Sequence, residues 1–272
     1  CAISGAALVI IEATGVEAKG RITPDCTGLY SDAQEAAFGE ILAFCRSVGP
    51  AKFGIQLSHA GRKGSTVKPW DGGGPVEGSG AWQTLAPSAV PYLEGWAAPE
   101  ALDEAGLSRI RDAFADAARR AARLDMPLFT QHGDPSIGEA YQAARAELGL
   151  GPGLALSPPA DGPGTVFVAR DVDRAWDRIG EYLLYEATEY SSWQQGVTSA
   201  VHDRSTTVEE MRAAGVYSVM TPDECVAFAE SIGPFDPITT HPLCGGIPPE
   251  LAWEHLELLG NEVIPRVKGP LG

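Results

Sequence analysis

The chain has 272 residues, a formal net charge of −16 and a hydrophobic content of 44%, which is ordinary for a soluble globular protein. So acidic a surface repels nucleic acid and anionic membranes, because both bind mainly through Lys and Arg contacts to phosphate. The apolar run from Ala6 to Ile11 is too short to span a bilayer, and no signal peptide is recognisable. We therefore expect a cytoplasmic protein that binds neither nucleic acid nor membranes.

Charge and cysteine content point to two dissimilar halves and to reduced thiols. Residues 1–125 carry 12 basic and 15 acidic side chains, whereas residues 126–272 carry 8 and 21. Such a shift indicates halves of different origin, with a boundary near residue 125. The five cysteines are scattered and lack CxxC spacing, which argues against a disulfide framework or a zinc site.

Apolar runs that alternate with amphipathic helices set the expected fold class. Helix starts are marked by Ser31 with Gln34, and by Thr221 with Pro222 and Glu224. Strands alternating with helices predict an α/β fold built from βαβ units, either a (β/α) TIM-like barrel or a doubly wound sheet. About seven strands would leave a barrel incomplete, and an open edge strand would favour a homo-oligomer. The predicted strands lie at 7–12, 53–57, 127–131, 154–157, 165–169, 216–219 and 238–241.

Residues 60–100 interrupt this alternation with a stretch that is rich in Gly and Pro and carries Trp70, Trp82 and Trp96. Structureless insertions of this length are lids or binding loops, or else they are disordered. The sequence leaves these alternatives open, since ordered Trp residues could also pack the loop against the rest of the fold.

Four stretches of the first half occur together and in a fixed order: LVIIEATGV (8–16), GRITPDCTGLYSD (20–32), FGIQLSHAGRKGST (53–66) and LAPSAVPY (85–92). On these stretches, residues 6–124 resemble the old yellow enzyme family, the NADH:flavin oxidoreductases that hold FMN in an eight-stranded barrel. The resemblance implies a partial barrel over residues 1–125 with an ene-reductase activity. In that activity NAD(P)H reduces FMN, which then reduces an activated alkene of a small-molecule substrate.

The resemblance assigns roles to several residues near strand ends. Gln56 lies near the end of its strand, and its amide can both donate to and accept from the pyrimidine edge of a flavin. Ala13 and Thr14 would contact the flavin ring through their backbone. His59 and Arg62 are weaker candidates for supporting the negative charge of the reduced flavin or for binding substrate. Without the resemblance, Gln56 would be read as a polar core residue and Arg62 as an exposed loop charge.

Parts of that family's pattern are not found in the first half. The His/His or His/Asn pair that grips the substrate carbonyl should follow residue 124, and no such motif is present there. The family's first strand and its late phosphate-binding loops are also not recognised. A catalytically inactive fusion remnant is therefore an alternative interpretation.

The second half carries a different set of stretches: PLFTQHGDP (127–135), GPGTVFVARDVDRAWDRIGEYLLYEA (162–187), TSAVHDRSTTVEEMRAAGVYSVMTPDECVAF (198–228) and HPLCGGIPPELAWEHLELL (241–259). On these, residues 126–272 resemble the C-terminal part of luciferase-like flavin monooxygenases. The chain would then be a hybrid, with an oxygenating flavin enzyme as an alternative function. Fold analogy does not choose between the two reactions.

Residues of the second half give few clear site candidates. The amides of Gly245 and Gly246 could approach a flavin or a phosphate closely, but a tight turn that needs glycine is at least as good an explanation. His241 and Cys244 by themselves are too few ligands for zinc, so no metal is expected. His132 and His202 are each more typical of structural hydrogen bonding than of catalysis.

Overall fold

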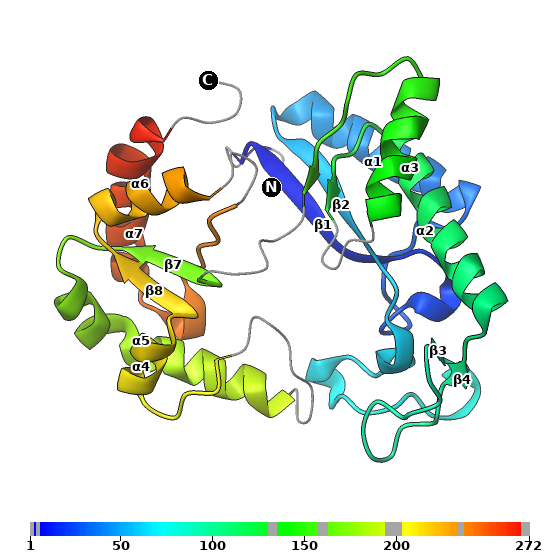
Figure 1. The fold of residues 1–272 in the computed structure, drawn as a ribbon, viewed down its shortest axis with the longest axis horizontal. Coiled ribbons are helices and arrows are strands. Elements are labelled where there is room, and N and C mark those ends of the chain that lie inside the picture. The colour runs from blue at the N-terminus through cyan, green and yellow to red at the C-terminus, as the bar shows by residue number, and fades with distance from the viewer. Residues whose placement is uncertain are drawn as a thin grey trace. The chain divides into compact units, whose positions relative to one another are not determined.

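The computed structural model describes residues 3, 6–129, 135–156, 163–193, 203–232 and 237–267. The chain divides into two compact units, Cys1–Ser157 and Pro158–Gly272, called unit 1 and unit 2 below (Figure 1). The change of resemblance expected near residue 125 does not coincide with this division. Leu128 pairs with Ile55 in one sheet, and this pairing keeps the segment after residue 125 in unit 1.

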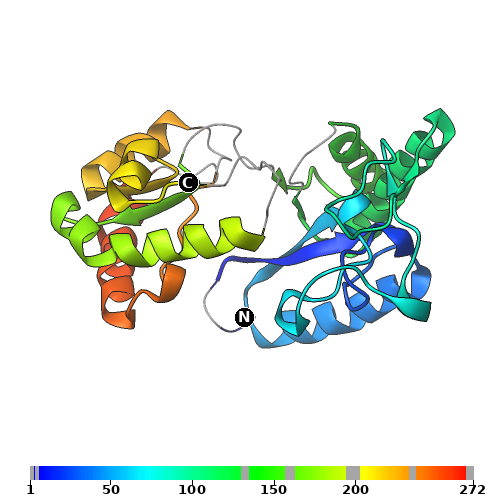
Figure 2. The ribbon, with the colours of Figure 1, turned by 90° about the horizontal axis from the view of Figure 1, so that it is seen from below.

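Unit 1 is built on a parallel sheet of four strands in the order β1-β2-β5-β6. The two long strands are β1 (Leu8–Gly15) and β2 (Lys52–Ser58), which run side by side in both views (Figure 1 and Figure 2). The predicted strands at 127–131 and 154–157 are confirmed over their described residues as β5 (Leu128–Phe129) and β6 (Ala155–Leu156).

Three helices of unit 1 lie on the same side of this sheet: α1 (Asp32–Val48), α2 (Glu104–Arg123) and α3 (Pro135–Glu147) (Figure 1). Alternate residues of β2 point to opposite faces of the sheet. Phe53, Ile55 and Leu57 share a buried core with small residues of α2. Gln56, which lies between the last two, therefore belongs to the opposite face.

The start of α1 follows the predicted cap with one difference. The Ser31 side chain accepts a hydrogen bond from the Gln34 amide, as expected. The Gln34 side chain, however, accepts from the Tyr30 amide, one residue before the position that a capping box requires. The helix begins where predicted, but its second bond is made outside the box.

The segment at 60–100 is described throughout and consists mainly of short turns. These are η2 (Gly61–Lys63), η3 (Pro69–Asp71) and η4 (Gly78–Gly80), followed by β3 (Leu85–Ala86), which pairs with β4 (Glu100–Ala101). The Trp82 indole donates to the Lys19 carbonyl over 3.1 Å. This bond connects the segment to the 3-10 turn η1 (Ala18–Gly20), which follows β1. The segment is therefore an ordered loop at this point.

Unit 2 contains a parallel pair of strands, β7 (Thr165–Val168) and β8 (Tyr217–Met220). The predicted strand at 238–241 is not a regular strand, although the Val166 amide donates to the Thr239 carbonyl over 2.8 Å. The Thr221 capping box is confirmed with both of its bonds. The remaining elements are α4 (Val172–Trp193), α5 (Val208–Ala214), α6 (Pro222–Ser231), η5 (Cys244–Gly246), α7 (Pro249–Leu258), η6 (Leu259–Val263) and η7 (Ile264–Arg266).

The fold is thus mixed α/β, as the alternation of strands and helices predicts. Over the described residues the strands form separate sheets of four, two and two strands, so the closed or nearly closed barrel stays a prediction. Within the same residues, no helix is both long and apolar enough to cross a membrane.

Candidate active site

The carboxyl ends of β1 and β2 form the edge where a parallel α/β sheet usually places its chemistry. Ile11 pairs with Ile55 and Thr14 pairs with Leu57, so β1 has one more residue than β2 between these two pairs. This extra residue is a β-bulge, and it lies opposite Gln56. Bulges interrupt the regular backbone ladder, so the chain around Ala13 can approach a ligand at this point.

The Thr14 side chain is committed to the protein itself. It is fully buried, and its hydroxyl donates to the Glu12 carbonyl over 2.8 Å and lies 3.1 Å from the Thr27 hydroxyl. Thr14 also pairs with Leu57, so its side chain points to the helix side of the sheet, away from the face of Gln56. A ligand contact from Thr14 would therefore have to use the backbone, as the resemblance implies.

His59 has partners at both ring nitrogens. Its Nδ1 accepts the Gly61 amide over 3.1 Å, so the proton of the neutral ring lies on Nε2. Nε2 then donates to the Glu17 carboxylate over 2.9 Å. His59 in this arrangement holds Glu17 in place.

Glu17 receives a second hydrogen bond, from Arg109 of α2. Burial raises the pKa of the Glu17 carboxyl, but the hydrogen bonds from His59 and Arg109 outweigh burial and bring the pKa below its ordinary value. Glu17 is therefore ionised at neutral pH. Sequence reasoning missed this carboxylate, although its place just after β1 was a usable signal.

Each unit contains a cavity. The cavity of unit 1 measures about 530 Å³ and is lined by residues that include Glu17, Leu85, Asp103 and Arg109. The cavity of unit 2 measures about 570 Å³ and lies between α4 and α7. Gln56 lines neither cavity, so the predicted flavin face and the charged cavity beside Glu17 are separate features.

Arg62, the other weak candidate, donates to the Ser88 hydroxyl over 3.0 Å in an exposed position. Its contact is thus with the 60–100 segment. His132 and His202 lie outside the described residues.

Both glycines of unit 2 use their amides inside the protein. The Gly245 amide donates to Glu186 Oε2 over 2.6 Å, and the Gly246 amide donates to the Leu243 carbonyl over 3.1 Å. Their backbone φ angles of 58° and 86° lie in the left-handed region that favours glycine. These contacts account for both glycines through a tight turn, and their contact with a cofactor stays a prediction.

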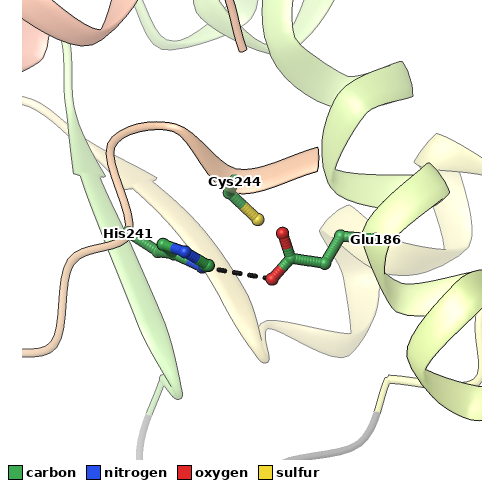
Figure 3. Close-up of side chains that lie close together, drawn as sticks. All are labelled: Glu186, His241 and Cys244. Carbon is green, nitrogen blue, oxygen red and sulfur yellow. Dashed lines mark ion pairs between the residues drawn. The ribbon is translucent and has the colours of Figure 1, made fainter. Parts of the chain in front are cut away.

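One cluster of unit 2 brings Glu186 next to His241 and Cys244, which are far from it in sequence. Glu186 of α4, His241 and Cys244 place their ligand atoms within 4.8 Å of one another, and all three side chains point toward a common centre (Figure 3). Burial raises the pKa of the Cys244 thiol, and the hydrogen bond and charge of Glu186 raise it further. A thiol so protonated is a poor nucleophile.

Comparison with known proteins supports the first resemblance over about half of the chain. An NADH:flavin oxidoreductase of Gibberella zeae is 38% identical over 133 residues, which cover 47% of this chain and 32% of that protein. An NADPH dehydrogenase of a Geobacillus strain is 34% identical over 132 residues, covering 48% and 34%. The chain spans about a third of the length of these relatives. No family model matches the chain.

Solved structures give a weaker likeness. Morphinone reductase in complex with tetrahydroNAD is 22% identical, with a TM-score of 0.41 over 56% of this chain and 50% of that one. The old yellow enzyme homologue of Zymomonas mobilis is 20% identical, with a TM-score of 0.41 over the same shares, 56% and 50%. TM-scores of this size do not establish a shared fold. The likeness of residues 126–272 to luciferase-like monooxygenases, and with it the hybrid interpretation, finds no support in these comparisons.

Proposed function

We propose that unit 1 carries part of the flavin site of an NAD(P)H-dependent oxidoreductase of the ene-reductase type. The proposal depends on one observation above the others: Gln56 lies on the sheet face opposite the helices, next to a bulge of β1. The sequence relatives support it, since they are named for NADH:flavin and NADPH oxidation. A small-molecule enone is the substrate class that this reaction type implies.

The residues around the bulge suit the pyrimidine edge of FMN. An amide side chain offers a donor and an acceptor together, and this edge of the ring presents both kinds of atom. Gln56 would bind it from β2, while the backbone of Ala13 and Thr14 would approach from β1. Bound FMN would supply the hydride chemistry, from NAD(P)H to the activated alkene.

The charged residues beyond the strands have a supporting role in this proposal. Since Glu17 is ionised and bonded to both His59 and Arg109, it is not suited to supply the second proton to the substrate. His59 positions Glu17 and does not face a ligand with a free ring nitrogen. In this arrangement the ring proton of His59 and the charge of Glu17 are both used within the protein.

Flavin binding by the full chain tests the proposal. Titration of the native chain into FMN should quench the flavin fluorescence as a complex forms. The complex should remain yellow after free FMN is removed. Gln56→Leu removes both polar groups and should weaken FMN binding roughly tenfold or more, because hydrogen bonds to a buried ligand contribute about 1–3 kcal/mol. Gln83→Leu, in the exposed part of the 60–100 segment, is the matched control and should bind FMN normally.

Turnover distinguishes the reaction types. With FMN bound, NADPH should be consumed under anaerobic conditions only when an enone such as cyclohexenone is added. If no FMN binds, or if Gln56→Leu and Gln83→Leu bind it equally well, the assignment of Gln56 is wrong. Consumption of NADPH that requires oxygen and yields an oxygenated product would contradict the ene-reductase type.

A further inference from the structure

The turn at Cys244–Gly246 is pressed against α4 at one point. A Cβ added to Gly245 would lie 1.8 Å from the carbonyl oxygen of Tyr182, which is far too close for two non-bonded atoms. Tyr182 and Glu186 are one helical turn apart and lie on the same face of α4. The glycine therefore lets the turn come close enough to reach Glu186.

Each side chain of the cluster presents a ligand atom to the same small volume (Figure 3). The Cys244 sulfur, one ring nitrogen of His241 and one carboxylate oxygen of Glu186 all lie within 4.8 Å of one another. Glu186 Oε1 lies 3.1 Å from His241 Nδ1. The other carboxylate oxygen, Oε2, accepts the Gly245 amide over 2.6 Å. This backbone bond fixes the orientation of the carboxylate and leaves Oε1 directed at the cluster.

The spacing is close to what one tetrahedral ion requires. Zinc binds sulfur at about 2.3 Å and nitrogen or oxygen at about 2.0–2.2 Å, so ligand atoms of one tetrahedral ion lie roughly 3.3–3.6 Å apart. The His241–Glu186 pair is already slightly closer than this, at 3.1 Å. The separations that involve the sulfur, at most 4.8 Å, exceed the upper end of this range by no more than about 1.2 Å.

Charge and ligand type narrow the choice of ion. A thiolate, an imidazole and a carboxylate together carry a charge of −2, which a divalent cation neutralises. Calcium and magnesium prefer oxygen ligands alone, whereas thiolate and imidazole favour zinc and its neighbours among the transition metals. His241 is 57% exposed, so the cluster is open to solvent on one side and leaves room for a fourth ligand.

We propose that Glu186, His241 and Cys244 bind one divalent transition-metal ion, best matched by zinc, with a water molecule as fourth ligand. The thiol proton of Cys244 passes to solvent as the metal–sulfur bond forms. The ion would fasten the 241–246 turn to α4. This proposal uses only unit 2 and does not depend on the proposed flavin site of unit 1.

Metal binding is measured on the full chain, treated with a chelator and then dialysed free of it. Titration calorimetry with zinc should show one ion bound per chain. Cobalt serves as a spectroscopic substitute, because a cobalt–thiolate bond gives a charge-transfer band in the near ultraviolet. Tetrahedral cobalt also gives much stronger visible bands than the octahedral ion.

Single substitutions identify the ligands. His241→Asn changes an exposed side chain and should preserve the fold, yet it should weaken zinc binding at least about tenfold, since even outer-shell partners contribute 10–100-fold to metal affinity. Cys244→Ser should abolish the cobalt–thiolate band. Glu186→Gln can still accept the Gly245 amide but is a poorer ligand, so it should weaken binding as well.

Matched controls separate this site from incidental thiol binding. Cys225→Ser removes another fully buried thiol of unit 2, and Glu181→Gln removes an exposed carboxylate of the same helix. Both controls should bind zinc with native affinity and retain the cobalt spectrum. Circular dichroism of every variant shows whether a loss of binding comes from unfolding.

The proposal is overturned if the native chain binds no zinc at near-stoichiometric concentration. It is also overturned if His241→Asn and Cys244→Ser, both folded, bind zinc as tightly as the controls do. A cobalt complex without the thiolate band would likewise refute it, because the ion would then be held elsewhere. In that case the three residues make only a His–Glu ion pair beside a buried thiol.

Discussion

Replacing Gly245 with alanine tests whether the 241–246 turn is really held against α4. The residue has a φ of 58°, and left-handed backbone costs a residue with a Cβ about 1–2 kcal/mol. The new Cβ would also force the turn away from the Tyr182 carbonyl and break the bond from the Gly245 amide to Glu186. A hydrogen bond to a charged group contributes about 1.5–3 kcal/mol. We therefore expect Gly245→Ala to destabilise unit 2 by roughly 3–5 kcal/mol.

Gly215→Ala is the matched control for this change. Gly215 ends α5 with a φ of 73°, and nothing lies within 4 Å of where its Cβ would be. Its substitution should therefore cost only the backbone term of about 1–2 kcal/mol. Amide hydrogen exchange in β7 and β8, measured at increasing denaturant concentration, reports on the unfolding of unit 2 alone. Equal losses of stability in the two variants would refute the close contact on which the proposed metal site depends.

Three further predictions concern polar side chains that are buried or partly buried. Burial lowers the pKa of His255 below 6.5, so unit 2 should lose stability as the pH falls from 6.5 to that lowered pKa, and lose no more below it. Urea unfolding at a series of pH values should show this dependence of stability on pH, and His255→Gln should remove it. Tyr141→Phe should destabilise unit 1 by about 1–3 kcal/mol in the same assay, because the buried Met126 carbonyl loses its donor. Hydrogen bonds from Arg123 hold the pKa of Glu35 below 4.5, so the stability that ionised Glu35 contributes to unit 1 is present above pH 4.5 and is lost in more acidic solution. Glu35→Gln should remove this dependence of stability on pH and should cost about 1 kcal/mol at neutral pH.

Local sequence signals predicted the elements well where their determinants are local. The Thr221 capping box is complete, and α6 begins with Pro222 at its first position. Most strand positions were also predictable, because continuous apolar runs mark strands of a covered parallel sheet. The run at 238–241 forms no regular strand, and the short β3 and β4 were not predicted. Which strands pair was not predictable in the same way, because pairing joins residues far apart in sequence, as Leu128 with Ile55.

Interactions across long sequence separations explain what the sequence did not reveal in unit 1. Glu17 is 42 residues from His59 and 92 residues from Arg109. The HAGRK motif drew attention to His59 as a possible ligand contact, whereas its ring nitrogens are both used within the protein. A motif identifies a residue type at a position, and only the surrounding chain decides which partners that residue meets.

The same reasoning explains why His241 and Cys244 looked too few for a metal. Counting ligands along the sequence finds only close neighbours, and Glu186 lies 59 residues before Gly245. One signal was nevertheless available, because Glu186 is seven residues after Ile179 and three after Leu183, both buried on the inner face of α4. Glu186 itself is partly buried, and a carboxylate beside such a face gains from a partner, because an unpaired charge out of water is costly. The Gly245 amide and His241 are two such partners of Glu186. The cation that we propose would bind Glu186, His241 and Cys244 together, and it would neutralise the negative charge of the Glu186 carboxylate.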